Sequence, residues 1–403
     1  MISPELLIED GLLTEDELEI PSFPDDRVDF GPVIESKNQI LAQAWSRFQS
    51  GAATRLQSEL DAFCEAKHQW LDDYALFMAI KEQQGGRSWH EWPDELRMRQ
   101  SAKLDQARTD LDESIREQKF RQFLFFRQWS NLKKYAAEKQ IRLIGDIPIF
   151  VSSDSADVWA NPSLFQVDEH HRPTVVAGVP PDYFCETGQL WGNPHYNWDA
   201  MRQRGYAWWI QRAQAMLEQV DWIRLDHFCG FEAAWHVPAG DETAIDGEYR
   251  PGPGSHFFQT LNEALDGLPF IAEDLGIVTK EVEALRDEFS LPGMKVLHFA
   301  FGDTSANPFL PHNYVLNSVA YTGTHDNNTS RGWYQEISND ARDRYRRYTG
   351  RDGEDVSWDL IRLAWSSVSA VAIAPLQDIL DLGEDARMNL PGRAAGNWSW
   401  RFT

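Results

Sequence analysis

Apolar residues in the first third of the chain recur with the spacing of an α-helix. One example is the stripe formed by Ile40, Leu41, Ala44, Trp45 and Phe48. Residues three or four apart lie on one face of a helix, so this spacing predicts amphipathic helices. The pattern continues from about residue 35 to residue 139, with breaks at the Gly-Gly pair 85–86 and at Trp-Pro 92–93. We therefore predict a helical insertion over residues 35–139.

After residue 140 the pattern changes to short apolar runs separated by amphipathic segments. Strands that alternate with helices in this way are typical of parallel βα units. Residues 152–200 are dense in Pro, Gly, Trp and Tyr and predict a loop-rich insertion. A closed (β/α)8 barrel has eight strands, whereas only six apolar runs are found here. The predicted strands are centred near residues 143, 223, 271, 297, 320 and 371.

Three of the predicted strands end in an acidic residue. Asp226 follows the run near 223, Glu273 follows the run near 271, and Asp326 follows the run near 320. The C-terminal ends of barrel strands converge on one face, so these carboxylates are predicted to meet in one pocket. Arg224 points to the same side as Asp226, because side chains two apart in a strand share a face. A buried structural ion pair is the alternative interpretation of Arg224 and Asp226.

Three carboxylates in one pocket could bind a hard metal such as Mg²⁺ or perform glycosyl transfer. Glycosyl transfer accounts for more of the neighbouring residues. Arg224 favours the ionised form of Asp226, which a nucleophile requires. The apolar run before Glu273 favours the protonated form, which a general acid requires. Capping or ion pairing still explains each acidic residue when it is taken singly.

The charge of the chain restricts its partners. There are 63 acidic residues against 38 Lys and Arg, which gives a net charge of −25. Such a surface repels phosphate backbones and anionic lipids, so we expect neither nucleic acid nor membrane as a partner. The 17 Trp, 22 Phe and 11 Tyr residues serve either core packing or contacts with the apolar faces of sugar rings.

The cysteines indicate a reducing compartment. Cys64, Cys185 and Cys229 are far apart and odd in number, which argues against a disulfide framework. No Cys and His residues have the spacing of a zinc site, and we expect neither a metal nor a cofactor. No signal peptide or long apolar span is visible, so we expect a cytoplasmic protein.

Several segments resemble those of one enzyme family. The segments RLDHF (224–228), AEDLG (272–276) and YTGTHDN (321–327) are similar to the catalytic segments of 4-α-glucanotransferases. This family, also called amylomaltases or disproportionating enzymes, is glycoside hydrolase family 77 of the α-amylase clan. The resemblance implies an α/β fold, a (β/α)8 TIM barrel, with residues 1–403 as a single catalytic barrel. Further similar segments are 145–149, 154–162, 176–184, 188–194, 387–389 and 396–401.

The resemblance also implies a role for individual residues. Asp226 matches the nucleophile, Glu273 the general acid/base, and Asp326 the third carboxylate, which stabilises the transition state. The residues implied in substrate binding are Asp146, Asp182, Tyr183, Phe184, Trp191, Asn193, Arg224 and His325.

The implied reaction is a retaining transfer of α-1,4-glucan segments between maltooligosaccharides, with glucose as a further acceptor. It proceeds through a covalent glucosyl-Asp intermediate, with nucleophile and acid/base about 5–5.5 Å apart. Three alternatives remain open: an α-amylase-like hydrolase, a glucan-binding chain without activity, and a metal-dependent enzyme.

The chain departs from the family pattern at its ends. Its first residues are similar to the segment that follows the first two barrel strands of the family, and its last residues precede the family's final helix. We therefore expect an incomplete barrel with open sheet edges. We expect the full family member to be an active transferase, and these 403 residues expressed alone to be inactive or insoluble.

Overall fold

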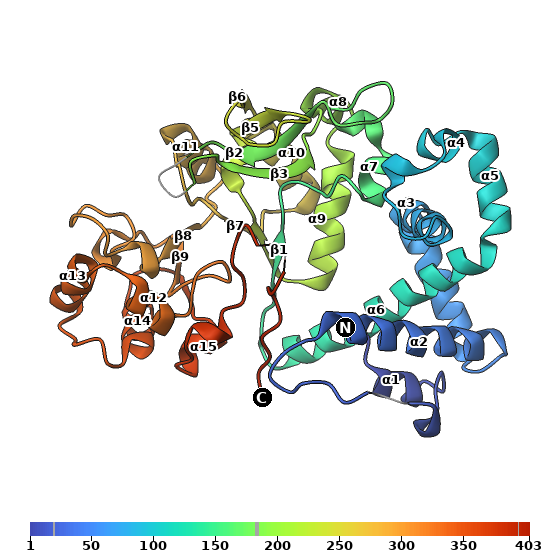
Figure 1. The fold of residues 1–403 in the computed structure, drawn as a ribbon, viewed down its shortest axis with the longest axis horizontal. Helices are drawn as coiled ribbons and strands as arrows, with labels where there is room; N and C mark the ends of the chain where they lie inside the picture. The colour runs from blue at the N-terminus through green and yellow to red at the C-terminus, as the bar shows by residue number, and fades with distance from the viewer. Residues whose placement is uncertain (19–20, 182–184, 394) are drawn as a thin grey trace. The chain divides into compact units, whose positions relative to one another are not determined.

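The computed structural model describes residues 1–18, 21–181, 185–393 and 395–403. The chain divides into two compact units (Figure 1). Unit 1 comprises Met1–Pro21 and Ile34–Pro269, and unit 2 comprises Ser22–Val33 and Phe270–Thr403. Each unit has its own parallel strands and its own buried apolar residues, so each is described by itself.

The helices predicted for the first third of the chain are present. Figure 1 shows α2, α3 and α6 as the long helices coloured blue to blue-green. The predicted apolar stripe of α2 faces α6, where Trp45 and Phe48 pack on Phe120 with ring centroids 5.3 and 4.8 Å away. The helices are α1 (Pro4–Glu9), α2 (Phe30–Gln49), α3 (Arg55–Gln83), α4 (Asp94–Arg97), α5 (Ser101–Asp110) and α6 (Asp112–Glu138).

Unit 1 contains one parallel strand pair. β1 (Ile144–Ile147) pairs with β4 (Trp222–Leu225) in a register that places Asp146 opposite Arg224. Helix α9 (Ala207–Gln219) precedes β4 and packs on both strands. A Cβ atom on Gly145 would lie 2.8 Å from Val220 Cγ1, so a glycine is needed where the chain leaving α9 crosses β1. The other helices of this region are α7 (Ala156–Ala160), α8 (Trp198–Gln203) and α10 (Gly254–Leu265).

The region predicted to be rich in loops also contributes two strands, β2 and β3, to an antiparallel sheet that the sequence analysis did not predict. The sheet has the strand order β3-β2-β5-β6. Its edge strand β3 carries Trp191 and Asn193. The apolar run at 175–179 was the signal for β2, but the surrounding Gly and Pro residues hid it. The strands are β2 (Val175–Val179), β3 (Gln189–Pro194), β5 (Ala233–Pro238) and β6 (Glu248–Pro251).

Unit 2 is built on four parallel strands, β7 (Phe270–Ala272), β8 (Gly293–Val296), β9 (Ser318–Tyr321) and β10 (Val371–Ile373). β8 pairs with β7 on one side and β9 on the other, and β10 pairs with β9. With β1 and β4, these strands match the six predicted strand positions. The helices are α11 (Lys280–Glu288), α12 (Ser330–Glu336), α13 (Asn339–Thr349), α14 (Val356–Trp365) and α15 (Leu376–Ile379).

One predicted strand is shorter than expected. The apolar run at 294–301 predicts a strand throughout, but β8 ends at Val296 and a 3-10 turn, Leu297–Phe299, follows. The carbonyl group of His298 accepts a hydrogen bond from the Trp333 indole at 3.1 Å instead of joining a β-ladder. This bond connects the turn after β8 to α12.

Within the described residues, no helix has the length and apolar character required to cross a membrane.

Candidate active site

Two aspartates and one arginine form a cluster at the ends of β1 and β4. The Arg224 guanidinium group donates from Nη1 to both oxygens of Asp146, at 2.8 and 2.7 Å, and to Asp226 Oδ1 at 2.9 Å. The Arg224 side chain is 10% exposed, whereas those of Asp146 and Asp226 are 43% and 40% exposed. The positive charge is therefore buried beneath two carboxylates that water or a ligand can reach.

The register of the two strands produces this cluster. Asp146 lies directly opposite Arg224 in the parallel ladder, and side chains at paired positions point to the same face. Asp226 follows the last residue of β4, and its backbone N–H donates to the Ile147 carbonyl at 3.0 Å. The predicted Arg224–Asp226 pairing is confirmed. The contact between Arg224 and Asp146 was not predicted.

His227 adjoins this cluster in an unusual backbone conformation. Its φ angle is +50°, in the left-handed region that most side chains avoid. Burial lowers the pKa of His227, and the negative charge of Asp226 opposes that shift. The Trp191 ring meets the His227 ring edge-on at 4.9 Å. The backbone turn at His227 therefore lies beside Trp191 of β3 in the antiparallel sheet.

The predicted substrate-binding residues of the 176–194 segment have different outcomes. Trp191 is 38% exposed and lies beside His227, which follows β4. Asn193 donates to the carbonyl of Val151, which follows β1, at 2.9 Å. Asp182, Tyr183 and Phe184 lie outside the described residues.

In unit 2, Glu273 is half-buried and follows directly on β7. The next residue, Asp274, is buried, and its carboxylate accepts hydrogen bonds from Met294 N at 2.7 Å and Arg286 Nη1 at 2.6 Å. Burial raises the pKa of Asp274, and these two hydrogen bonds oppose the shift. Of the two adjacent acids, Asp274 attaches β7 to β8 and α11, and Glu273 is the candidate for chemistry.

A second carboxylate of unit 2, Asp326, has a defined set of partners. Asn389 Nδ2 donates to Asp326 Oδ1 at 2.6 Å, and His325 Nε2 lies 3.4 Å from Asp326 Oδ2. Arg387 donates to the backbone carbonyl of Asp326 at 2.8 Å. The Asp326 side chain remains 41% exposed. The C-terminal segment therefore fixes this carboxylate without covering it.

Asn389, Arg387 and Trp398 are residues of this site that the sequence did not single out. Trp398 packs against the His325 ring at a centroid distance of 5.2 Å and is 50% exposed. The only signal for them was the similarity of segments 387–389 and 396–401 to the family, which gave no roles to individual residues.

A buried polar layer supports the loop that carries His325 and Asp326. Asp378 is completely buried and accepts from Thr322 Oγ1 at 2.6 Å and from Ser330 N and Oγ, both at 2.7 Å. His298 lies 3.0 Å from Ser330 Oγ through Nε2 and stacks on Trp333. Burial lowers the pKa of His298 to about 3. The end of β9 thus rests on the buried Asp378 carboxylate, on two hydroxyl groups and on the His298 ring.

The predicted residues therefore fall into two groups, one in each unit. Unit 1 brings together Asp146, Arg224 and Asp226, with Trp191 nearby. Unit 2 brings together His325 and Asp326 and carries Glu273 at the end of β7. Among the described residues, no group of three His, Cys, Asp or Glu side chains could hold a metal ion.

Comparison with known proteins gives a consistent result. The family described as 4-alpha-glucanotransferase matches residues 1–403. A 4-alpha-glucanotransferase from Synechocystis is 52% identical over 407 residues, which cover 100% of this chain and 81% of that protein. A 4-alpha-glucanotransferase from Thermus thermophilus is 50% identical over 393 residues, covering 96% of this chain and 79% of that protein.

Solved structures agree with the sequence comparison. The amylomaltase from Streptococcus agalactiae in complex with acarbose has a TM-score of 0.95 at 38% identity, covering 100% of this chain and 82% of that chain. The amylomaltase from Corynebacterium glutamicum has a TM-score of 0.73 at 19% identity, covering 93% of this chain and 56% of that chain, and shows the fold alone.

Proposed function

Because the chain belongs to the 4-alpha-glucanotransferase family, we propose that it transfers α-1,4-glucan segments from a donor maltooligosaccharide to the 4-hydroxyl group of an acceptor glucan, with retention of configuration. The predicted fold class, an incomplete (β/α)8 barrel, is confirmed by the match to amylomaltase structures. That residues 1–403 form a single catalytic barrel, with 35–139 and 152–200 as insertions, stays a prediction.

The proposed reaction has two displacements. In the first, Asp226 attacks the anomeric carbon while Glu273 gives its proton to the leaving glycosidic oxygen, which forms a glucosyl ester on Asp226. In the second, Glu273 takes the proton of an acceptor hydroxyl group, which attacks the same carbon and releases Asp226. Asp326 stabilises the positive charge that develops on the sugar ring in both transition states.

The contact of Arg224 with Asp226 is the observation that carries this proposal. A nucleophilic carboxylate must be ionised and held in one orientation. The buried Arg224 guanidinium group occupies Asp226 Oδ1 at 2.9 Å and supplies the opposite charge. Asn389 holds one oxygen of Asp326 at 2.6 Å in a similar way. The Oδ1 atoms of Asp226 and Asp326 are therefore each fixed by a hydrogen bond from the protein.

Transfer rather than hydrolysis requires that a sugar reach the glucosyl ester before water does. We assign this role to residues 176–194, whose described part includes the exposed aromatic ring of Trp191 beside His227. Substrate contacts are proposed for Asp146, Asp182, Tyr183, Phe184, Trp191, Asn193, Arg224 and His325.

The proposed substrates are neutral maltooligosaccharides and longer α-1,4-glucans, with glucose as an acceptor. A neutral substrate suits a chain with a net charge of −25, and by the same argument we expect neither nucleic acid nor membrane as a partner. We also keep the cytoplasm as the proposed compartment, which the cysteine thiols at 64, 185 and 229 support.

Incubation with maltotriose tests the proposal directly. We expect glucose together with maltopentaose and longer oligosaccharides, and we expect added glucose to shorten the products. Glucose and maltose without any longer product would identify a hydrolase and contradict the transfer assignment. Binding of maltotriose without turnover would instead favour a glucan-binding chain.

A further inference from the structure

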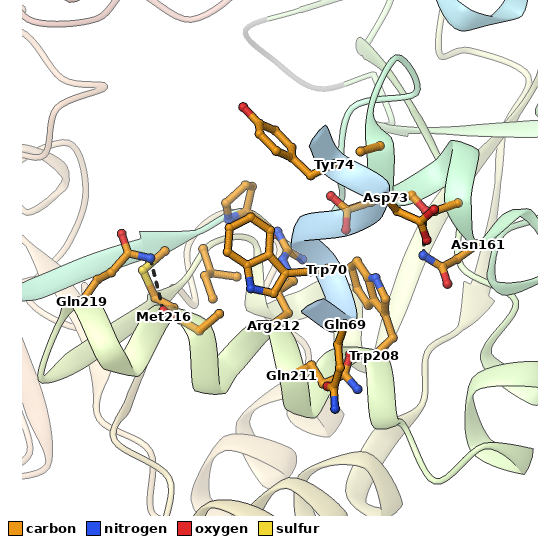
Figure 2. Close-up of a pocket in the computed structure, with 16 residues that line it drawn as sticks. Gln69, Trp70, Asp73, Tyr74, Asn161, Trp208, Gln211, Arg212, Met216 and Gln219 are labelled. Carbon is orange, nitrogen blue, oxygen red and sulfur yellow. Dashed lines mark hydrogen bonds between the residues drawn. The ribbon is translucent and has the colours of Figure 1, made fainter. Parts of the chain in front are cut away.

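One cavity in unit 1 is lined by none of the residues proposed above for catalysis or substrate binding. It is enclosed by α3, α7, α9 and the end of β1, and its volume is about 320 Å³. Figure 2 shows Trp70 and Arg212 in the middle of its lining, with Met216 and Gln219 on one side and Asp73 and Asn161 on the other. Such a volume lies at the small end of the ~300–1,000 Å³ that is typical of ligand pockets.

Aromatic rings line this cavity from two helices. Trp70 and Tyr74 are one turn apart on α3, with ring centroids 6.0 Å from each other, and Trp208 lies on α9. All three rings are only partly buried. Partly exposed indole and phenol rings in a concave site are apolar platforms that can stack against a flat ligand.

Charged and amide side chains complete the lining. The Arg212 guanidinium group donates hydrogen bonds to the carbonyl groups of Pro148 at 2.8 Å and Ile149 at 3.3 Å. It also lies over the Trp209 ring. Asp157 faces this positive charge, and the loss of surrounding water raises the pKa of its carboxyl group.

The remaining polar groups are uncharged or already paired. Gln69, Gln211 and Asn161 contribute amide groups. Asp73, the second acidic residue of the lining, is paired with Arg99 at 2.7 Å. The cavity therefore offers hydrogen-bond donors and acceptors with balanced charge, which disfavours both anionic and cationic ligands.

We propose that this cavity is a non-catalytic binding site for one or two glucose units of an α-glucan. A pyranose ring has apolar CH faces for the aromatic platforms and hydroxyl groups for the Asp157, Arg212 and amide groups. Glucan is also the ligand that the proposed function brings to this protein, so the identity of the ligand rests on that function. The site would hold one part of a long substrate while another part reacts, which raises the local concentration of glucan.

The inference is tested in a background that prevents turnover. The Glu273→Gln variant is titrated with maltotriose by calorimetry, and we expect two binding events, one of them in the cavity. Adding Trp70→Ala removes a stacking platform and should weaken the cavity event by about tenfold or more, leaving the other event unchanged. The matched control is Trp365→Ala, which removes a tryptophan on α14 that is 58% exposed and does not line the cavity.

A second variant guards against misfolding of the first. Ala215→Gln on α9 fills the cavity with a good helix former and should remove the same binding event. In the catalytically competent protein, both variants should raise KM for long amylose by about three- to tenfold and leave KM for maltotriose within about twofold.

The outcomes separate this inference from the proposed function. If Trp70→Ala and Ala215→Gln both leave the maltotriose isotherm unchanged, the cavity binds no glucan and the inference is wrong. If a single binding event is found and both variants abolish it, maltotriose binds in the cavity. The absence of a second event would then contradict the proposed catalytic function.

Discussion

The guanidinium group of Arg224 joins carboxylates that are contributed by two different strands. Its Nη1 atom contacts both Asp146 and Asp226. Arg and Lys are not equivalent at such a position, because a lysine ammonium group lacks the planar geometry that fixes both partners. The orientation of the proposed nucleophile therefore depends on the shape of this side chain as well as on its charge.

We predict that Arg224→Lys lowers kcat for maltotriose disproportionation by about 100-fold, equivalent to ~3 kcal/mol, with a smaller change in KM. The positive charge remains, so the loss reports orientation. Initial rates measure the effect. Arg121→Lys, at an ion pair with Glu117 on α6, is the matched control and should change kcat by less than about twofold. Equal kcat values for Arg224→Lys and the unmodified protein would refute the positioning role.

Asn389 is the corresponding positioning residue for Asp326. Leucine has nearly the same shape but cannot donate to Asp326 Oδ1. We expect Asn389→Leu to lower kcat by about 10- to 100-fold, while Asn389→Gln restores part of the activity. Asn317→Leu, which removes an amide donor to the Ser290 carbonyl in the same unit, serves as the control. An unchanged kcat with an increased KM would show that Asn389 contacts substrate instead.

At the residue level, the sequence predicted contacts between near neighbours and missed those between distant ones. Arg224 and Asp226 are two apart in one strand, so their common face followed from strand geometry. Arg224 and Asp146 are 78 apart, and Asn389 and Asp326 are 63 apart. Such contacts depend on strand register and on the path of the C-terminal segment, which a single sequence does not reveal.

The end of β9 is positioned by close packing between elements. A Cβ atom on Gly323 would lie 2.6 Å from His298 Cε1, so only glycine allows the loop to cross the imidazole ring. The same loop continues to His325 and Asp326. Packing around one glycine therefore connects β8, β9 and the proposed catalytic carboxylate.

Gly323→Ala tests this packing. We expect it to destabilise the protein by ~2–3 kcal/mol and to lower kcat, because the added methyl group displaces the loop. In a His298→Ala background the same change should cost at least ~1 kcal/mol less, since the clashing ring is absent. Chemical unfolding of the four proteins measures this coupling. Additive effects in the double variant would show that the two residues do not press on each other.

Buried histidines make the stability of both units depend on pH. Burial lowers the pKa of His195 to about 3, that of His236 to about 4 and that of His298 to about 3. In the unfolded chain these groups titrate near ~6.5. Below that value the unfolded state binds more protons than the folded state, so the free energy of unfolding falls as the pH is lowered toward 3–4. Above about pH 6.5 their contribution to the free energy of unfolding is fully present.

We therefore predict that the unfolding temperature is constant between about pH 7 and 8 and decreases steadily from about pH 6 to pH 4.5. In that window each buried histidine lowers the free energy of unfolding by up to ~1.4 kcal/mol for each pH unit of acidification, which lowers the unfolding temperature. His298→Gln should reduce the slope, and the exposed His68→Gln control on α3 should not. A His298→Gln profile parallel to that of the unmodified protein would rule out His298 as a source of this dependence.

At the level of elements, the sequence predicted all six parallel strands but not the antiparallel sheet. The inner strands β4, β7, β8 and β9 are mostly buried and give short apolar runs, which are easy to find. The strands β3 and β6 are largely exposed and contain Gly, Pro and charged residues. Their pairing with β2 and β5 comes from contacts across the chain, which local pattern does not record.

For the whole molecule, the proposed mechanism assigns complementary roles to residues of two compact units. Asp226 belongs to unit 1, and Glu273 and Asp326 belong to unit 2. Similarity along the full length of the chain made the reaction predictable from sequence, whereas composition alone only argued against anionic partners. The central claim is that Asp226 becomes covalently bound to a glucosyl group and that Glu273 supplies acid and base.

Mass spectrometry of a trapped intermediate tests this claim most directly. A maltotriosyl fluoride donor has a leaving group that needs no proton, so the Glu273→Gln variant can form the glucosyl ester but cannot activate an acceptor to release it. We predict an added maltotriosyl mass on the peptide that contains Asp226, and no such mass in the Asp226→Asn, Glu273→Gln double variant. A label on another residue, or an unlabelled Glu273→Gln protein that still consumes the donor, would contradict the account.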